Sequence, residues 1–185
     1  PIVTALDALP ALRFSGVVFA NELLDNLPFE IVEAGADGWN EVRVALDGDA
    51  FVDVRVPLGE RAGEVAFQVL PDPASVPVGT QLPVPVALRD LIARVGTRLT
   101  RGVLACIDYA EPYAELSARD GGWLRTFAGQ ERSGSPLDAP GARDITSDVP
   151  IEQFEGAARA AGFEGVTTET QAEWLRGLGI DALAD

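Results

Sequence analysis

The sequence predicts an α/β layered fold that carries an antiparallel β insertion. Two short apolar runs, Gly16–Ala20 and Val103–Ile107, are typical of central parallel strands covered on both faces. A helical pattern between them predicts a right-handed crossover, because strand, helix and strand then lie in one parallel sheet. Alternating apolar and polar residues after the first run predict a β-hairpin. We therefore expect a parallel sheet with a smaller antiparallel sheet inserted after its first strand.

The crossover helix is predicted over residues 86–95. Pro85 suits its first turn, and Gly96 is predicted to end it as a C-terminal cap. Its apolar face has helical spacing and consists of Leu88, Leu91, Ile92 and Val95.

The insertion is predicted over residues 29–70. Residues 42–46 and 52–56 alternate in polarity, and Asp47-Gly48-Asp49 between them predicts the turn of a hairpin. Glu64–Leu70 is expected to add another strand. The proline-rich residues 71–85 are expected to form an extended connector.

The last third of the chain is predicted to alternate strands and helices. We expect a strand at Gly122–Ala128, an irregular loop over residues 129–147 and a further strand at Phe163–Thr170. A helix is expected between Asp148 and Gly162, with an apolar face of Ile151, Phe154, Ala158 and Ala161. A short helix over residues 171–178 is expected to bury Trp174, Leu175 and Leu178.

Composition excludes several classes of chemistry. The 185 residues contain no His and no Lys, so all fourteen basic residues are Arg, and the formal net charge is −15. Without His or Lys, a Ser-His-Asp triad, a Schiff base or a His-based metal site cannot be built from this chain, and we expect no metal. The acidic balance argues against a nucleic-acid partner.

The cellular setting is predicted from what the sequence lacks. Cys106 is the single cysteine, so there is no internal disulfide framework, and a reducing compartment fits. No apolar run approaches the roughly 18–20 residues of a membrane span, and no signal peptide is recognisable. We therefore expect a cytoplasmic protein.

Polar residues follow both predicted central strands at the point where each ends. Asn21, Glu22 and Asp25 follow the first strand, and Asp108, Tyr109 and Glu111 follow the second. Ligands of open α/β sheets bind beyond the carboxyl ends of the strands, so we expect both groups to face one crevice. There, paired carboxylates could accept a proton or hold a cation. The alternative is that Asn21 caps a short helix that begins at Glu22 and ends near Asp25 and Asn26.

Other candidates have plainer interpretations. Gly177-Leu178-Gly179 follows a helix and indicates a helix end rather than a phosphate loop. Cys106 lies in an apolar strand and is expected to be a buried thiol. Arg125 and Arg143, with Asp144, could bind a carboxylate, but ion pairs that hold a loop are favoured.

Five segments, in order, resemble the MidA-type S-adenosylmethionine-dependent methyltransferases, which include a mitochondrial complex I assembly factor that methylates protein arginine. The first, FANELLDNLPFEIVE, is similar to the family's Asn-Glu motif with its following Asp and Pro. The other four are GVLACIDYAEPY, GGWLRTFAGQ, DAPGARDITSDVPIEQF and TETQAEWLRGLGI. Together these segments span nearly the whole chain.

The resemblance implies a partial class I methyltransferase sheet, which is Rossmann-like, with S-adenosyl-L-methionine as cofactor. It implies that Asn21, Glu22 and Asp25 are catalytic, with Asn21 also touching the cofactor. Glu22 and Asp25 would orient a guanidinium, whose planar fork carboxylates match. The expected partner is a protein with an exposed arginine, in respiratory-complex assembly. The implied substrate-binding residues are Asp108, Tyr109 and Asp144.

The resemblance also implies what these residues do not contain. Family members carry the glycine-rich cofactor loop in an N-terminal half, and no segment here matches it. The 185 residues are therefore expected to be the C-terminal portion of an enzyme, inactive alone and able to associate as a homo-oligomer through an exposed apolar edge. The alternative function is a non-catalytic assembly module that keeps the methyltransferase fold.

Overall fold

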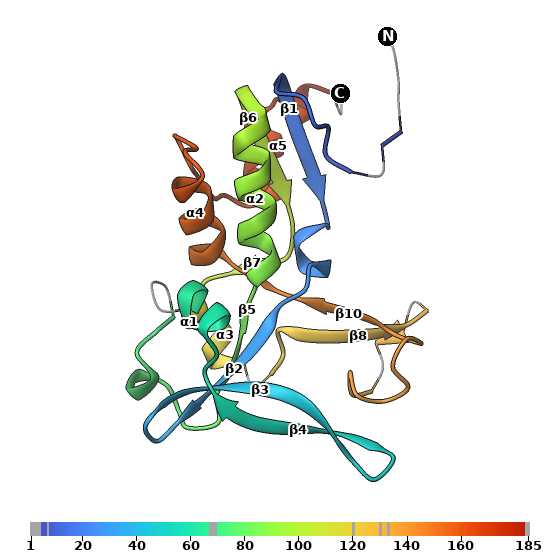
Figure 1. The fold of residues 1–185 in the computed structure, drawn as a ribbon. Helices are drawn as coiled ribbons and strands as arrows, with labels where there is room; N and C mark the ends of the chain where they lie inside the picture. The colour runs from blue at the N-terminus through green and yellow to red at the C-terminus, as the bar shows by residue number, and fades with distance from the viewer. Residues whose placement is uncertain are drawn as a thin grey trace.

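A parallel strand pair forms the centre of the upper part of the molecule (Figure 1). The computed structural model describes residues 5–6, 8–66, 70–119, 121–129, 131–132 and 134–183. Strand β1 (Phe14–Asn21) pairs in parallel with β6 (Leu99–Ile107), and Asn21 lies opposite Ile107. The predicted adjacency of these two strands is confirmed.

Helix α2 (Val86–Arg98) makes the crossover between the two strands, with Pro85 at its N-cap. Gly96 does not end the helix as predicted, because α2 continues for two more residues. Its role is close packing, since a Cβ at Gly96 would lie 2.7 Å from the carbonyl oxygen of Ala161.

Helix α4 (Ile151–Ala160) packs beside α2 on the same face of the strand pair (Figure 1). The predicted helix is therefore confirmed, although Pro150 and not Asp148 is its N-cap residue. The two helices and β6 enclose one hydrophobic core, whose buried members are Leu24, Leu88, Ile92, Val149, Ala157 and Ala158.

The prediction that both faces of the strand pair are covered is wrong for the described residues, because the face opposite α2 and α4 is open. Val17 and Phe19 of β1 are 68% and 56% exposed, and Val103 of β6 is 56% exposed. One aromatic contact lies on this face, where the ring of Phe19 stacks on Trp174 with centroids 6.4 Å apart.

The insertion is a four-stranded antiparallel sheet in the order β4-β3-β2-β5. Strands β3 (Gly38–Asp47) and β4 (Ala50–Pro57) form the predicted hairpin, in which Asp47 pairs with Ala50 and Gly48 adopts a φ of 61°. Strand β2 (Glu30–Gly35) pairs with β3 on one side and β5 (Gln81–Val84) on the other.

Two predictions at the end of the insertion are wrong. Residues 64–66 belong to helix α1 (Glu60–Ala66) instead of a strand, and residues 67–69 of that prediction lie outside the described residues. Residues 71–85 are more than a connector, because they contain a 3-10 turn, η2 (Pro73–Ser75), and strand β5. Pro83 is tolerated in β5 because this strand lies at the edge of the sheet.

The residues that follow β6 form two further small sheets. The short strands β7 (Ala110–Glu111) and β11 (Val149–Pro150) pair in parallel. The strand predicted at Gly122–Ala128 is confirmed as β8 (Leu124–Ala128), which begins two residues later and is flanked by β9 (Glu131–Arg132) and β10 (Asp144–Ser147). The predicted irregular loop over residues 129–147 therefore contains two strands. Helix α3 (Tyr113–Ala118) precedes β8.

A second hydrophobic core lies between the insertion sheet and α3. Trp123 fills its centre, is fully buried and donates from Nε1 to the carbonyl of Gln81 at 2.8 Å. Its buried members are Val32, Leu82, Val84, Val86, Tyr113, Leu116 and Trp123.

The C-terminal segment departs from its prediction. No strand forms over residues 163–170, where Gly165 adopts a φ of 63° that interrupts an extended chain. Helix α5 (Gln171–Gly177) is confirmed and ends at the predicted glycines. It buries less than expected, because Trp174 and Leu175 are half-buried and Leu178 is 66% exposed. The 3-10 turn η3 (Ile180–Leu183) follows.

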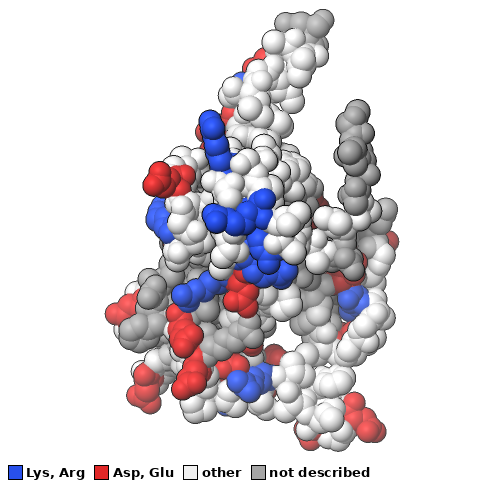
Figure 2. Space-filling model, turned by 45° about the horizontal axis from the view of Figure 1, so that its top comes forward, with Lys and Arg blue, Asp and Glu red and all other residues white. Residues whose placement is uncertain are grey.

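Charge is distributed unevenly over the surface. Figure 2 shows a face on which arginine side chains gather near the centre, whereas acidic side chains are scattered below them. Across the described ranges, no helix is both long and apolar enough to cross a membrane.

Candidate functional site

The candidate site begins where β1 ends, in a loop with an unusual backbone. The N–H of Glu22 donates to the carbonyl of Ile107 at 2.8 Å, which continues the pairing of β1 with β6. Glu22 then adopts a φ of 47°, in the left-handed region. Such a conformation costs a residue with a side chain about 1–3 kcal/mol and often marks a functional position.

Asp108, the first residue after β6, holds the turn that follows Glu22. One of its carboxylate oxygens, Oδ2, accepts backbone N–H groups from Leu23 at 3.1 Å, Leu24 at 2.7 Å and Asp25 at 3.4 Å. The other oxygen, Oδ1, accepts the N–H of Tyr109 at 2.9 Å. The turn is the 3-10 helix η1 (Leu24–Asn26), so its N-terminus is capped from the neighbouring strand.

Asn21 is not the cap that the alternative interpretation required. The N-cap position of η1 is Leu23, and no side chain of the turn itself caps it. The amide of Asn21 and the carboxylate of Glu22 have no hydrogen-bond partner within the described part of the chain, and both residues are exposed. Both side chains are therefore available to a ligand.

Asp25 is the buried carboxylate of the site, at 5% exposure. Burial raises the pKa of its carboxyl, and the nearby charges of Asp108 and Glu22 raise it further, against a smaller lowering by Arg125. Asn26 donates from Nδ2 to Oδ1 of Asp25 at 2.7 Å and fixes its orientation. The structure thus brings the carboxylates of Glu22, Asp25 and Asp108 close together. That they face one ligand crevice stays a prediction.

A charged network borders this carboxylate group. Asp148, which is 2% exposed, receives Nη1 of Arg125 at 2.5 Å and Nη1 of Arg119 at 3.2 Å. The guanidinium of Arg125 also lies 5.2 Å from the ring centroid of Tyr109. Arg119 reaches Glu111 through Nη2 at 2.7 Å. These four side chains and Tyr109 line a hollow of about 290 Å³ together with Asp108 and Ala110.

The sequence predicted ion pairing for Arg125, which is confirmed, but with a different partner. Its partner is Asp148, whereas Asp144 is exposed at the start of β10. Arg143 donates from Nε to the carbonyl of Asp138 at 3.0 Å and so supports its own loop.

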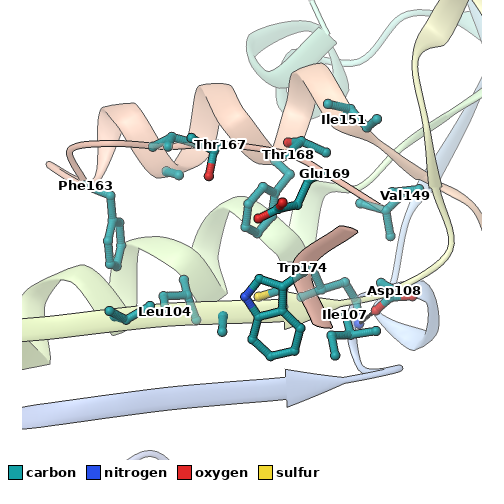
Figure 3. Close-up of a pocket in the computed structure, with 18 of the residues that line it drawn as sticks. Leu104, Ile107, Asp108, Val149, Ile151, Phe163, Thr167, Thr168, Glu169 and Trp174 are labelled. Carbon is teal, nitrogen blue, oxygen red and sulfur yellow. Dashed lines mark hydrogen bonds between the residues drawn. The ribbon is translucent and has the colours of Figure 1, made fainter. Parts of the chain in front are cut away.

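A larger cavity of about 380 Å³ lies on the other side of Asp108, between β6, α4 and residues 163–169 (Figure 3). Leu104, Phe154 and Phe163 give it apolar walls, while Thr168 and Glu169 are polar members of its lining. Figure 3 shows Trp174 lying against β6, near Ile107 and Asp108.

Cys106 also lines this cavity and behaves as the expected core thiol. It is half-buried and packs against the core around α2 and α4. Burial, with a smaller contribution from Asp108, raises the pKa of the thiol to about 11, so it is protonated near neutral pH. Cys106 is therefore not an activated nucleophile.

Two functional features escaped sequence reasoning. Asp148 was predicted only as the residue before a helix, although it anchors both arginines. The left-handed backbone of Glu22 has no signal in an Asn-Glu-Leu-Leu segment, because only glycine or asparagine would indicate such a conformation. The one sequence signal for the role of Arg125 was the Leu-Arg pair at residues 124–125, because this pair lies in a segment that resembles the methyltransferase family.

Comparison with known proteins shows what the chain is similar to. Residues 3–167 match a family model described as "Putative S-adenosyl-L-methionine-dependent methyltransferase". A search of the curated proteins finds no match.

Two solved structures from Burkholderia thailandensis are similar over nearly the whole chain. An uncharacterised protein is 34% identical, with a TM-score of 0.84, over 96% of this chain and 47% of its own. A second protein of the same superfamily, bound to S-adenosyl-homocysteine, is 31% identical, with a TM-score of 0.82, over 96% of this chain and 46% of its own. The chain therefore spans about half the length of these relatives.

Proposed function

Because the chain belongs to the family of S-adenosyl-L-methionine-dependent methyltransferases, we propose that the carboxylates beyond β1 and β6 form the acceptor side of a methyl-transfer site. The observation that carries this proposal is the environment of Asp25. Its carboxylate is buried beside Asp108 and Glu22, and its pKa is raised by burial and by those charges. Such an arrangement opposes stability, and perturbed carboxylates of this kind are typical of proton-transfer sites.

The residues at the end of β1 fit part of the cofactor. The relative bound to S-adenosyl-homocysteine supports binding of the same class of ligand by this chain. The free amide of Asn21 can donate to a carboxylate or hydroxyl group and accept from an amine. When bound, S-adenosyl-L-methionine supplies a methyl group on a positively charged sulfur. We assign Asn21 to the cofactor, with Glu22 beside it.

Glu22 and Asp25 are assigned to the acceptor nitrogen. During the transfer a nitrogen–carbon bond forms, the carbon–sulfur bond breaks with its electron pair going to sulfur, and the acceptor nitrogen loses a proton. The raised pKa of Asp25 makes its carboxylate a better proton acceptor than an ordinary aspartate. The exposed carboxylate of Glu22 is free to orient the acceptor and to balance its positive charge.

We propose protein arginine as the acceptor. A guanidinium presents five N–H donors in a plane, which two adjacent carboxylates can engage. Tyr109 is 55% exposed and already holds the guanidinium of Arg125 against its ring, so its remaining exposed surface suits a second one. The net charge of −15 also favours a basic protein partner. We assign Asp108 and Tyr109 to substrate binding, with Asp144 as an outlying contributor.

The experiment is a methyl-transfer assay on the Glu22→Gln variant of the full-length protein, with labelled S-adenosyl-L-methionine and arginine-containing proteins of respiratory-complex assembly. Loss of one charge-assisted contact should raise the barrier by about 1.5–3 kcal/mol. The matched control is Glu64→Gln, because Glu64 is exposed on α1, in a different part of the fold.

The outcomes separate the two functions considered. A large loss of transfer in Glu22→Gln, with an unchanged melting temperature and an active control, supports catalysis at this site. Normal turnover of Glu22→Gln removes Glu22 from the mechanism. Absence of transfer in the wild-type protein, together with specific binding to an assembly partner, would favour the non-catalytic module. The predicted inactivity of the 185 residues alone stays a prediction.

A further inference from the structure

The outer side of β4 is a long open strand edge. β4 is the end strand of the insertion sheet, and in the described ranges no strand pairs with its outer side. Figure 1 shows β4 along the lower margin of the molecule, away from the α2 and α4 helices. An open edge of eight residues presents backbone groups that can template another strand.

The hairpin register determines which backbone groups point outward. Asp47 and Ala50 flank a two-residue loop and therefore form a hydrogen-bonded pair. Hydrogen-bonded and non-hydrogen-bonded pairs alternate along antiparallel strands, so Val52 and Val54 direct their N–H and C=O groups toward β3. Phe51, Asp53 and Arg55 direct theirs outward. The outward carbonyl of Asp53 accepts a hydrogen bond from Nη1 of Arg55 at 3.4 Å, which fits a carbonyl that does not pair with β3.

The side chains of β4 alternate between the two faces of the sheet, and one face carries two opposite charges, Asp53 and Arg55. Asp53 and Arg55 share the outer face of the sheet and are exposed, while the valines between and beside them point to the other face and are half-buried. The same outer face carries exposed apolar side chains near the hairpin tip: Val44, Leu46 and Phe51 are 57%, 68% and 43% exposed.

We propose that this edge pairs with the same edge of a second copy of the chain, antiparallel about a two-fold axis at Val54. In that register Asp53 lies opposite the partner's Arg55, and Arg55 lies opposite the partner's Asp53. Both pairs use outward-pointing backbone groups, so the two strands exchange N–H···O bonds at these positions. The interface is isologous, as two-fold symmetry requires.

Other registers are disfavoured by charge. With the axis at Asp53, two aspartates face each other, and with the axis at Arg55, two arginines do. Moving the axis by two residues along β4 separates Asp53 from Arg55 altogether. The axis at Val54 is thus the register that pairs both charges with opposite partners. Pairing then ends at Pro57, which lacks an N–H group.

Within one chain, Arg55 reaches across β3 to Glu33 on β2. Its Nε and Nη2 atoms bind the carboxylate of Glu33, with Nη2 2.5 Å from Oε2. The third nitrogen, Nη1, donates to the carbonyl of Asp53 at 3.4 Å. Because the guanidinium is planar, Arg55 reaches the partner's Asp53 by exchanging part of its contact with Glu33.

Disulfide trapping tests the register directly. Val54→Cys and Val52→Cys are each made in a Cys106→Ala background, so that the introduced thiol is the one that can pair. Two copies of residue 54 meet at the axis as a non-hydrogen-bonded pair, whose Cα separation of roughly 4.5 Å suits a disulfide. Residue 52 lies opposite the partner's Val56 and does not meet its own copy. Mild oxidation should cross-link Val54→Cys and leave Val52→Cys monomeric on a non-reducing gel.

Sedimentation velocity over a wide concentration range tests the pairing without a cross-link. The wild-type chain should dimerise, and Asp53→Lys should weaken dimerisation by roughly tenfold or more, because like charges then face each other twice. Asp53→Pro, which removes an outward N–H on an edge strand, should abolish it. A wild-type chain that stays monomeric, or equal cross-linking of both cysteine variants, overturns the proposal. Melting curves confirm that each variant is folded.

Discussion

Oδ2 of Asp108 accepts the backbone N–H of Leu24 at 2.7 Å, although the two residues are 84 positions apart in the sequence. This bond ties the end of β6 to the turn that follows β1. The same oxygen accepts two further N–H groups of that turn, so one carboxylate fixes the backbone that presents Glu22 and Asp25. Asp108 therefore organises the site in addition to any contact it makes with a substrate.

Asp108→Asn should destabilise the protein. An amide keeps one acceptor oxygen but turns an NH₂ group toward N–H donors, so charge-assisted bonds are lost at a cost of roughly 1.5–3 kcal/mol. Urea denaturation measures the change. Asp144→Asn is the control, because Asp144 is exposed and should change stability by about 0.5 kcal/mol or less. Equal effects of the two substitutions would contradict the role assigned to Asp108.

Gly102→Ala should disrupt the parallel strand pair. Gly102 adopts a φ of 147°, and a Cβ there would collide with the backbone of Gly16 on β1. Strain and clash together should cost about 2–4 kcal/mol in the free energy of unfolding.

The matched control for that substitution is Gly177→Ala. A Cβ at Gly177 in α5 meets no atom within 4 Å and its φ is not positive, so the change should be neutral or stabilising by about 0.4–1 kcal/mol. Thermal denaturation of both variants distinguishes the close approach at Gly102 from a general intolerance of alanine for glycine.

Glu33→Gln should weaken the insertion sheet in a pH-dependent way. Hydrogen bonds from Arg55 lower the pKa of Glu33, so the stabilisation is present above the ordinary glutamate value of 4.5 and is lost as the pH falls through the lowered pKa. The pair is partly exposed, so we expect a loss of about 0.5–1 kcal/mol at neutral pH. Chemical denaturation at neutral and at acid pH should show this difference shrinking; a constant difference would argue against the ion pair.

The sequence predicted the elements whose signal is local. Gly16–Ala20 and Val103–Ile107 are apolar without interruption, which correctly predicted a parallel strand pair but wrongly predicted that both of its faces are covered. The hairpin around Gly48 combines alternation with a turn residue, so its register was also predictable. Gly96 and Gly102 were not assigned their roles, because a close approach between distant segments leaves no trace in a short window. Residues 163–170 contain several β-branched residues, which strands favour, but a strand also needs a partner edge, which sequence alone does not reveal.

The location of the candidate site could be predicted from the sequence, but the contacts among its side chains could not. The positions of Asn21, Glu22, Asp25 and Asp108 follow from the rule that ligands bind at the carboxyl ends of parallel strands. That Asp108 caps η1 and that Asp148 anchors Arg125 depends on side-chain directions across strands. Such contacts join segments that lie far apart in the sequence, as the contact of η1 with β10 also does.

Asp25→Asn should stabilise the fold while it impairs methyl transfer. Burial and the charges of Asp108 and Glu22 raise the pKa of Asp25, so the folded state binds its proton more tightly than the unfolded state does. Stability therefore falls as the pH rises from the ordinary value of 3.8 through the raised pKa. Asparagine has the same shape and no charge, and its Oδ1 can still accept the bond from Asn26.

The variant should gain roughly 0.5–2 kcal/mol in the free energy of unfolding at neutral pH, and the gain should vanish below pH 3.8. Transfer should fall by about 100-fold or more, because the carboxylate that takes the proton is gone. Denaturation at several pH values and the methyl-transfer assay measure the two effects on the same protein. A variant less stable than the wild type at neutral pH would show that the charge of Asp25 supports the turn, and one with full activity would exclude Asp25 as the proton acceptor. Gain of stability with loss of transfer is the combination expected of a carboxylate kept in an unfavourable place for its chemistry.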